Sequence, residues 1–129
     1  MIGETDLDTL LASLQPRVHP DEFVYCTAPE PLGDPVCVFR EAEGFTLILP
    51  RREAQRLGLA FTYPCRMITL TVHSSLAAVG LLARVTALLA ERGISVNAVS
   101  AYYHDHLFVP VERAEDAMEA LKTARRSHL

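Results

Sequence analysis

The fold of this chain is decided by residues 66–110, which read RMITLTVHSSLAAVGLLARVTALLAERGISVNAVSAYYHDHLFVP. Apolar Ile68, Leu70 and Val72 alternate with polar residues, the period-two pattern of a half-buried strand. The apolar residues that follow recur at the spacing of an α-helix, and Gly93 suits the left-handed conformation that ends a helix. The residues expected to bury this helix along most of its length are Val79, Leu82, Val85, Leu88 and Leu89. One helix therefore links two strands of one sheet.

The rest of the chain contains further predicted helices and strands. Asp6 is a candidate cap for a first helix, Gly44 suits the turn of a hairpin, and Gly58 suits the end of a second helix. The expected elements are a helix at 7–14, a strand at 23–27, a hairpin of 36–41 and 45–49, a helix at 50–57 and a last helix at 112–125.

This order reads as two similar halves, residues 1–60 and 61–129. Each half resembles an incomplete βαββαβ unit, which predicts an α+β, ferredoxin-like fold with antiparallel sheets and helices on one face. Each half also lacks a strand that the other half or a partner chain has to provide. We therefore expect a homodimer or larger homo-oligomer, with pairing of the two lobes inside one chain as the alternative.

The helix and its flanking strands resemble the core of ACT domains. The residues that carry this resemblance are Gly80, Ala83, Val85, Leu88, Leu89, Ala90, Gly93, Ile94, Val96, Asn97 and Val99. The segments SSLAAVG and YYHDHLFVP are similar to a narrower group, small bacterial proteins of two ACT-type units that also resemble CASTOR-type amino-acid sensors. The resemblance implies a ligand-sensing role, usually for an amino acid.

The start of the long helix is the best candidate for a ligand site. Backbone N–H groups there have no partner within the helix and lie at its positive end, so they suit the carboxylate of an amino acid. Gly80 allows close approach. The alternative is that Ser74 or Ser75 only caps the helix and that Gly80 serves packing.

The resemblance to ACT domains implies an effector between this loop and the following strand. That region corresponds here to residues 75–80 and 97–100. An amide such as that of Asn97 can bind an amino or carboxyl group, although Asn at a strand edge is also an ordinary solvent or turn residue. The candidate ligand-binding residues are Ser74, Ser75, Leu76, Ala77, Val79, Gly80, Asn97, Ala98, Val99 and Ser100.

The polar cluster of His104, Asp105 and His106 raises the question of a metal site. The two histidines share a face of an extended strand, but Asp105 is expected in a tight turn and no third ligand has a suitable spacing. We therefore expect no metal and no cofactor. His73 followed by Ser74 is not a catalytic triad, and no other motif assembles a nucleophile, so the chain is not expected to be an enzyme.

Composition excludes several other classes of protein. The net charge is −4 and the basic residues are scattered, which argues against nucleic acid; the arginines near residue 52 read as a solvated helix face. Half of the residues are hydrophobic, yet every apolar run ends well short of the ~20 residues that span a membrane. The start, MIGETDLDTL, is acidic where a signal peptide is basic, so a cytoplasmic location is expected. The three cysteines, Cys26, Cys37 and Cys65, are expected to be core thiols.

Two functions remain. The first is a cytoplasmic regulatory module that binds an amino acid or related small metabolite and acts through assembly or a partner protein. The second is a structural protein–protein interaction module without a ligand, in which residues 75–80 form an ordinary helix start.

Overall fold

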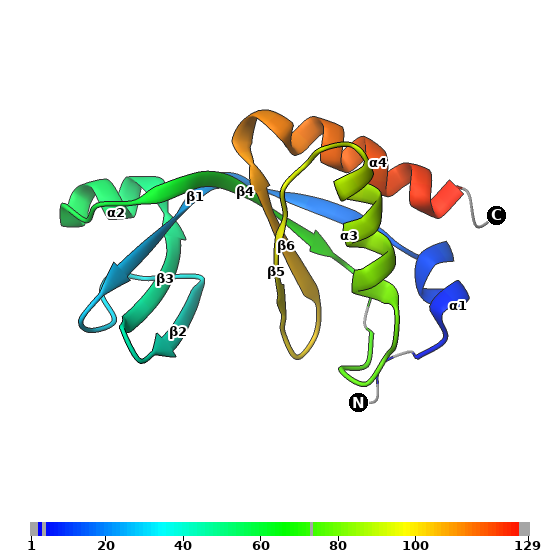
Figure 1. The fold of residues 1–129 in the computed structure, drawn as a ribbon, viewed down its shortest axis with the longest axis horizontal. Helices are drawn as coiled ribbons and strands as arrows, with labels where there is room; N and C mark the ends of the chain where they lie inside the picture. The colour runs from blue at the N-terminus through cyan, green and yellow to red at the C-terminus, as the bar shows by residue number, and fades with distance from the viewer. Residues whose placement is uncertain (1–2, 4, 73, 127–129) are drawn as a thin grey trace.

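The chain forms one six-stranded antiparallel sheet with the strand order β2-β3-β1-β4-β6-β5 (Figure 1). The computed structural model describes residues 3, 5–72 and 74–126. In chain order the elements are α1 (Leu7–Ala12), β1 (Pro16–Ala28), β2 (Cys37–Glu41), β3 (Gly44–Pro50), α2 (Arg51–Leu57), β4 (Thr62–Leu70), α3 (Leu81–Glu91), β5 (Asn97–Ser100), β6 (Asp105–Pro110), a 3-10 turn at Val111–Arg113 and α4 (Ala114–Arg126). The α+β, ferredoxin-like prediction is confirmed.

The helices cover one face of the sheet in two groups. Figure 1 shows α2 at one end of the molecule and α1, α3 and α4 at the other. The larger core lies beneath the second group and contains the buried residues Leu10, Leu11, Leu14, Ile68, Leu70, Leu81, Val85, Leu89, Ile94, Leu107, Val109, Ala114, Ala117, Ala120 and Leu121. A smaller core beneath α2 contains Val24, Cys26, Ala28, Leu47, Leu49 and Ala54. Alternation along each strand assigns these residues to the helix-covered face.

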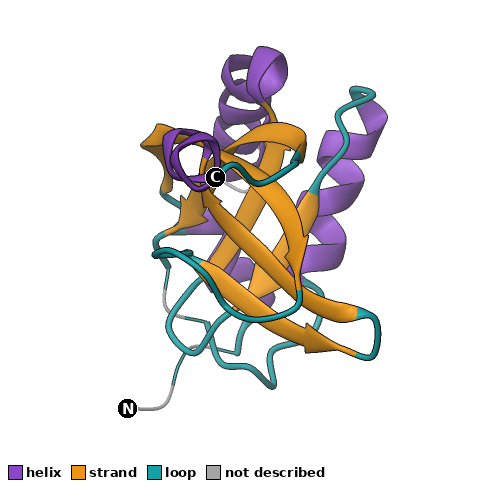
Figure 2. Cartoon of the chain, turned by 90° about the vertical axis from the view of Figure 1, so that its left-hand side faces the viewer, coloured by secondary structure: helices purple, strands orange, loops and turns teal. Residues whose placement is uncertain are grey.

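The opposite face of the sheet carries no helix, yet it is also buried at its centre. Phe23 and Phe108 are only 2% and 1% exposed, and their rings meet edge to face at 6.2 Å. The sheet is curled, and the β2–β3 and β5–β6 hairpins project to the same side of the long strands (Figures 1 and 2). The curl therefore shields a third cluster of apolar and aromatic side chains, which includes Tyr25, Ile48 and Met67.

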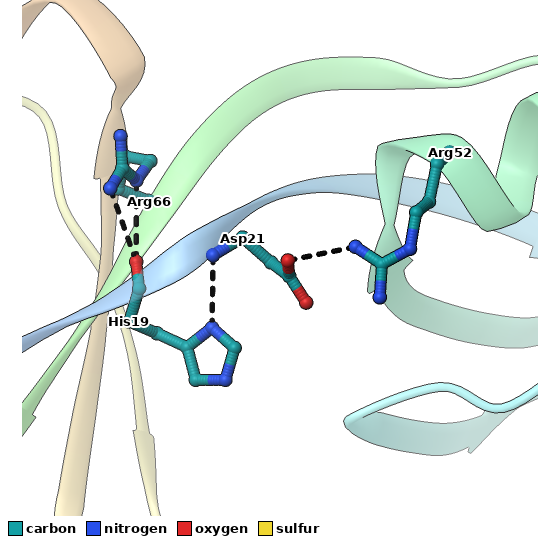
Figure 3. Close-up of polar contacts among 4 residues, drawn as sticks. All are labelled: His19, Asp21, Arg52 and Arg66. Atoms are coloured by element: carbon teal, nitrogen blue, oxygen red, sulfur yellow. Dashed lines mark hydrogen bonds and ion pairs between the residues drawn. The ribbon is translucent and has the colours of Figure 1, made fainter.

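The strand β1 is much longer than the predicted strand at 23–27 because a bulge interrupts its pattern. Pairing with β4 shifts register between Val18 and Glu22, where the sequence contains Pro20. Side chains satisfy the backbone of this bulge (Figure 3): Arg66 donates twice to the His19 carbonyl at 3.3 Å, and the Asp21 N–H donates to Nδ1 of His19 at 3.1 Å. Apolar periodicity alone cannot reveal a strand that continues through a bulge.

The arginines of α2 attach the helix to β1. Arg51 pairs with Glu22 at 2.6 Å, and Arg52 pairs with Asp21 at 2.8 Å. The arginine face of α2, which was predicted to be solvated, therefore makes tertiary contacts over part of its length. The Arg52 guanidinium lowers the pKa of Asp21. Arg52 remains 71% exposed, and such pairs contribute little to stability.

The helix α3 is less buried than its sequence predicts. Only Leu81, Val85 and Leu89 are buried within it, and Val79 lies before the helix with 85% exposure. Leu82 is partly exposed because α3 presents a single stripe to the core. The expectation of a largely buried helix is therefore wrong.

The cysteines are free thiols in the apolar interior or at its margin. Cys26 and Cys65 are buried, as predicted, whereas Cys37 is only partly buried. Burial raises the pKa of Cys65 to about 12, which suppresses its thiolate at neutral pH. Among the described residues, no helix has the length and apolar character needed to cross a membrane.

Candidate functional site

A pocket of about 190 Å³ lies at the N-terminal end of α3. Three segments form it: the loop that precedes α3, the first turn of α3, and the tip of the β5–β6 hairpin. Its lining residues are Ser74, Ser75, Leu76, Ala78, Gly80, Leu81, Leu82, Ala83, Ser100, Ala101 and Asp105. The pocket therefore joins the predicted helix start to the predicted following strand.

The helix start presents donors to this pocket. Gly80 is the N-cap residue with φ 101° and ψ −12°, and its carbonyl accepts the first helical hydrogen bond from the Arg84 N–H at 2.9 Å. The N–H groups of Leu81, Leu82 and Ala83 therefore have no acceptor within the helix. All three residues line the pocket. The positive end of the helix dipole adds to the attraction of this turn for an anion.

Neither serine of the loop caps α3. The Ser75 hydroxyl accepts the Ala77 N–H at 3.0 Å, and the Ser75 carbonyl accepts the Ala78 N–H at 3.0 Å. These bonds fold the loop into a local turn. The capping interpretation of the serines is therefore wrong, because the N-cap position is occupied by Gly80.

Asp105 supplies the acidic group of the pocket. It is the first residue of β6, paired with Ser100 on one side and Leu70 on the other, and it is 8% exposed. The expected position in a tight turn is wrong, because the hairpin turn closes between Ala101 and His104 through a backbone bond of 3.0 Å. Within the described residues, the Asp105 carboxylate makes no hydrogen bond or ion pair with another side chain. It is thus available to a ligand.

The structure brings half of the predicted ligand-binding residues to this pocket. Ser74, Ser75, Leu76, Gly80 and Ser100 line it. Ala77, Val79, Asn97 and Ala98 lie outside the lining, and Val99 lines a different pocket on the opposite face of the sheet. Residues that alternate along β5 face opposite ways, so a whole strand segment never lines one pocket.

Gly3 lies against the backbone of the loop before α3. A Cβ added to Gly3 would lie 2.6 Å from both the Ser74 carbonyl carbon and the Ser75 nitrogen, so the two backbones are in close contact there. A Cβ on Gly80 would meet Cδ2 of Leu7 at 3.3 Å. A side chain at Gly80 would therefore point toward α1. A substitution there is expected to disturb the packing against Leu7 rather than to contact a ligand directly.

The two histidines of the HDH segment lie edge to face, but their Nδ1 atoms have different partners. His104 Nδ1 lies 2.8 Å from the Tyr103 carbonyl oxygen, whereas His106 Nδ1 lies 2.9 Å from the Thr69 hydroxyl on the helix-free face. Their ring centroids are 6.4 Å apart. Burial lowers the pKa of His106. Within the described part of the chain, no three His, Cys, Asp or Glu side chains gather into a metal-binding group.

Comparison with known proteins places this fold in one family. A model of the ACT domain matches residues 2–66, and a second ACT domain model matches residues 62–123. The chain belongs to the ACT domain family. ACT domains are regulatory rather than catalytic, so the chain is in general terms a regulatory, ligand-binding module.

Solved structures share the fold of this chain. A Vibrio cholerae protein of unknown function, described as a possible transport protein, is 42% identical, with a TM-score of 0.84 over 92% of this chain and 95% of that one. The regulatory subunit of aspartate kinase from Thermus flavus shares the fold at 11% identity, with a TM-score of 0.64 over 84% of this chain and 95% of that one. No curated protein matches the sequence.

Proposed function

We propose that this chain is a cytoplasmic amino-acid sensor that binds a free amino acid, or a closely related small metabolite, in the pocket before α3. The observation that carries the proposal is the pairing of opposite charges in one pocket. The N–H groups of Leu81, Leu82 and Ala83, which have no acceptor within the helix, attract a carboxylate, and the Asp105 carboxylate attracts an ammonium group. An amino acid carries both groups on one carbon.

The size and polarity of the pocket support a small ligand. Its volume of about 190 Å³ is below the range of about 300–1,000 Å³ typical of drug-sized ligands. Ser75 and Ser100 add hydroxyl groups to its wall. The resemblance to CASTOR-type sensors, carried by SSLAAVG and YYHDHLFVP, points to the same class of ligand.

The signal is proposed to leave through assembly or a partner protein. In this proposal residues 1–60 and 61–129 form two ACT-like lobes, a division supported by the family matches to residues 2–66 and 62–123. The outer edge of β2 supports self-association, because β2 pairs with β3 on one side only. Val36, just before β2, and Val38 and Phe39 within it are 47%, 43% and 66% exposed. The same edge also favours the alternative function, an interaction module that needs no ligand.

A thermal-shift screen of the common amino acids distinguishes the two functions. A ligand present at a hundred times its Kd raises the free energy of unfolding by about 2.7 kcal/mol, so one or a few amino acids are expected to raise the Tm clearly. The decarboxylated amine of each hit is the matched control and is expected to give no shift. If no amino acid stabilises the protein, the interaction-module function takes precedence.

A further inference from the structure

The helix-free face of the sheet contains a second pocket, of about 220 Å³. It lies where the curl of the sheet brings the start of β2 toward the end of β5. Its lining residues are Val36, Cys37, Met67, Val99, Ala101, His106 and Phe108. Phe108 is 1% exposed and its ring meets that of Tyr25 edge to face at 6.0 Å, so the base of the pocket is fixed by the aromatic cluster.

This pocket differs from the amino-acid pocket in its chemistry. Every lining residue except His106 is apolar or weakly polar, and none is an acid, a lysine or an arginine. Burial lowers the pKa of His106, which favours the neutral ring at pH 7. An apolar cavity of about 150 Å³ is large enough to bind benzene. A pocket of this size and lining therefore suits an uncharged ring and rejects a zwitterion.

The ring of His106 is the most polar group in the lining of this pocket. Its Nδ1 is engaged with the Thr69 hydroxyl at 2.9 Å, which fixes the plane of the ring. The remaining ring nitrogen, Nε2, makes no hydrogen bond to any described residue. It serves as donor or acceptor according to the tautomer that Thr69 selects, and a ligand hydroxyl can match either state.

We propose that this pocket is a second binding site, which takes a small uncharged aromatic molecule bearing one hydroxyl group. The ring lies among Met67, Val99 and Phe108, and the hydroxyl group bonds to His106. This site is separate from the amino-acid pocket, but the two share a wall. Ser100 and Asp105 face one pocket, Val99 and His106 face the other, and Ala101 lines both.

Methionine methyl NMR with phenol as the probe tests the proposal. Met67 lines this pocket, whereas Met118 lines a groove beside α4 and serves as an internal control. Phenol is expected to shift the Met67 methyl resonance saturably through the ring current and to leave the Met118 resonance unchanged. Toluene, which lacks the hydroxyl group, is expected to bind about tenfold more weakly.

Blocking variants locate the site. Val99→Phe fills the pocket from β5 and is expected to weaken phenol binding by about tenfold or more. Val38→Phe is the matched control and is expected to bind as wild type does, because Val38 of β2 faces the opposite side of the sheet from Cys37. Cys37→Leu fills the pocket from the other wall, and far-UV circular dichroism and thermal melts identify any variant that has not folded.

Three results would overturn the proposal. The first is a Met67 resonance that does not respond to millimolar phenol. The second is an equal response of Met118, which indicates non-specific partitioning. The third is a Met67 resonance that shifts with protein concentration in the absence of phenol, together with a failure of phenol to bind. In that case the pocket is occupied by a side chain of a second copy of the protein.

Discussion

Ser100 and Asp105 face each other across the β5–β6 hairpin, and both line the pocket at the N-terminal end of α3. Asp105 therefore shares this pocket with Leu81, Leu82 and Ala83, whose N–H groups have no acceptor within the helix. The pocket thus presents a negative group and a positive group to one small ligand, which is the basis of the proposed amino-acid site.

The Asp105→Asn variant is expected to lose amino-acid binding without losing stability. A hydrogen bond to a charged group contributes about 1.5–3 kcal/mol, so calorimetry with the best hit of the screen should show affinity lowered by about tenfold to a hundredfold. The unliganded variant should unfold at the wild-type urea concentration or above, because no described side chain bonds to the Asp105 carboxylate. Asp34→Asn, in an exposed loop, is the control. If the Asp105→Asn variant binds the amino acid with unchanged affinity, Asp105 is not part of the binding site.

The Gly80→Ala variant is expected to be destabilised even without ligand. Its φ of 101° lies outside the left-handed well of ordinary residues, and the added Cβ meets Leu7 at 3.3 Å. We expect the free energy of unfolding to fall by about 1–3 kcal/mol in urea titrations. Gly58→Ala is the matched control, with φ 69° and open space around its Cβ, and should lose only about 1 kcal/mol. Equal losses in the two variants would show that the Leu7 contact contributes nothing.

The sequence predicted the fold class well because most strands and helices carry a clean period and clear end signals. Asp6 accepts the Thr9 N–H at 3.0 Å, and Gly58 closes α2 in the left-handed conformation, both as predicted. The errors occur where tertiary structure decides. The β1 bulge at Pro20 hid half of a strand, and the exposure of α3 depends on which helices cover it.

The sequence predicted the loop of the candidate site, residues 74–80, but not the contribution of Asp105. The loop before α3 has local signals, namely a glycine and a helix start. The burial of Asp105 depends instead on hairpin register, which pairs it with Ser100 and turns it to the helix-covered face. A one-residue change in the turn would face it to the other side. The sequence signal that could have pointed to Asp105 was an acidic residue in a short polar segment between two predicted strands.

Stability is expected to fall as pH drops below 6.5, and His106 should account for part of the loss. Its pKa is lowered in the folded state, first by burial and then by His104, so protonation favours the unfolded chain. The contribution is complete above the unfolded pKa of about 6.5 and disappears toward the lower, folded pKa. Urea unfolding between pH 7.5 and 5.5 should show a smaller slope in His106→Gln than in wild type. An identical slope would exclude His106 as the source.

Self-association is expected to depend on the edge of β2. Phe39 is 66% exposed on this edge strand, and a lysine there opposes edge-to-edge pairing. Light scattering should show a wild-type dimer and a largely monomeric Phe39→Lys variant. Tyr102→Lys, at a site of 61% exposure in the β5–β6 turn, is the control. A dimer disrupted by Tyr102→Lys alone would assign the interface to the other hairpin.

The most direct test of the amino-acid site is an amide NMR titration with the best hit of the thermal screen. We expect the amide resonances of Leu81, Leu82 and Ala83 to shift saturably, because their N–H groups receive the ligand carboxylate. The decarboxylated amine should leave these three resonances in place. Saturable shifts confined to the β2 edge or to the groove beside α4, with residues 81–83 unmoved, would contradict the proposed site.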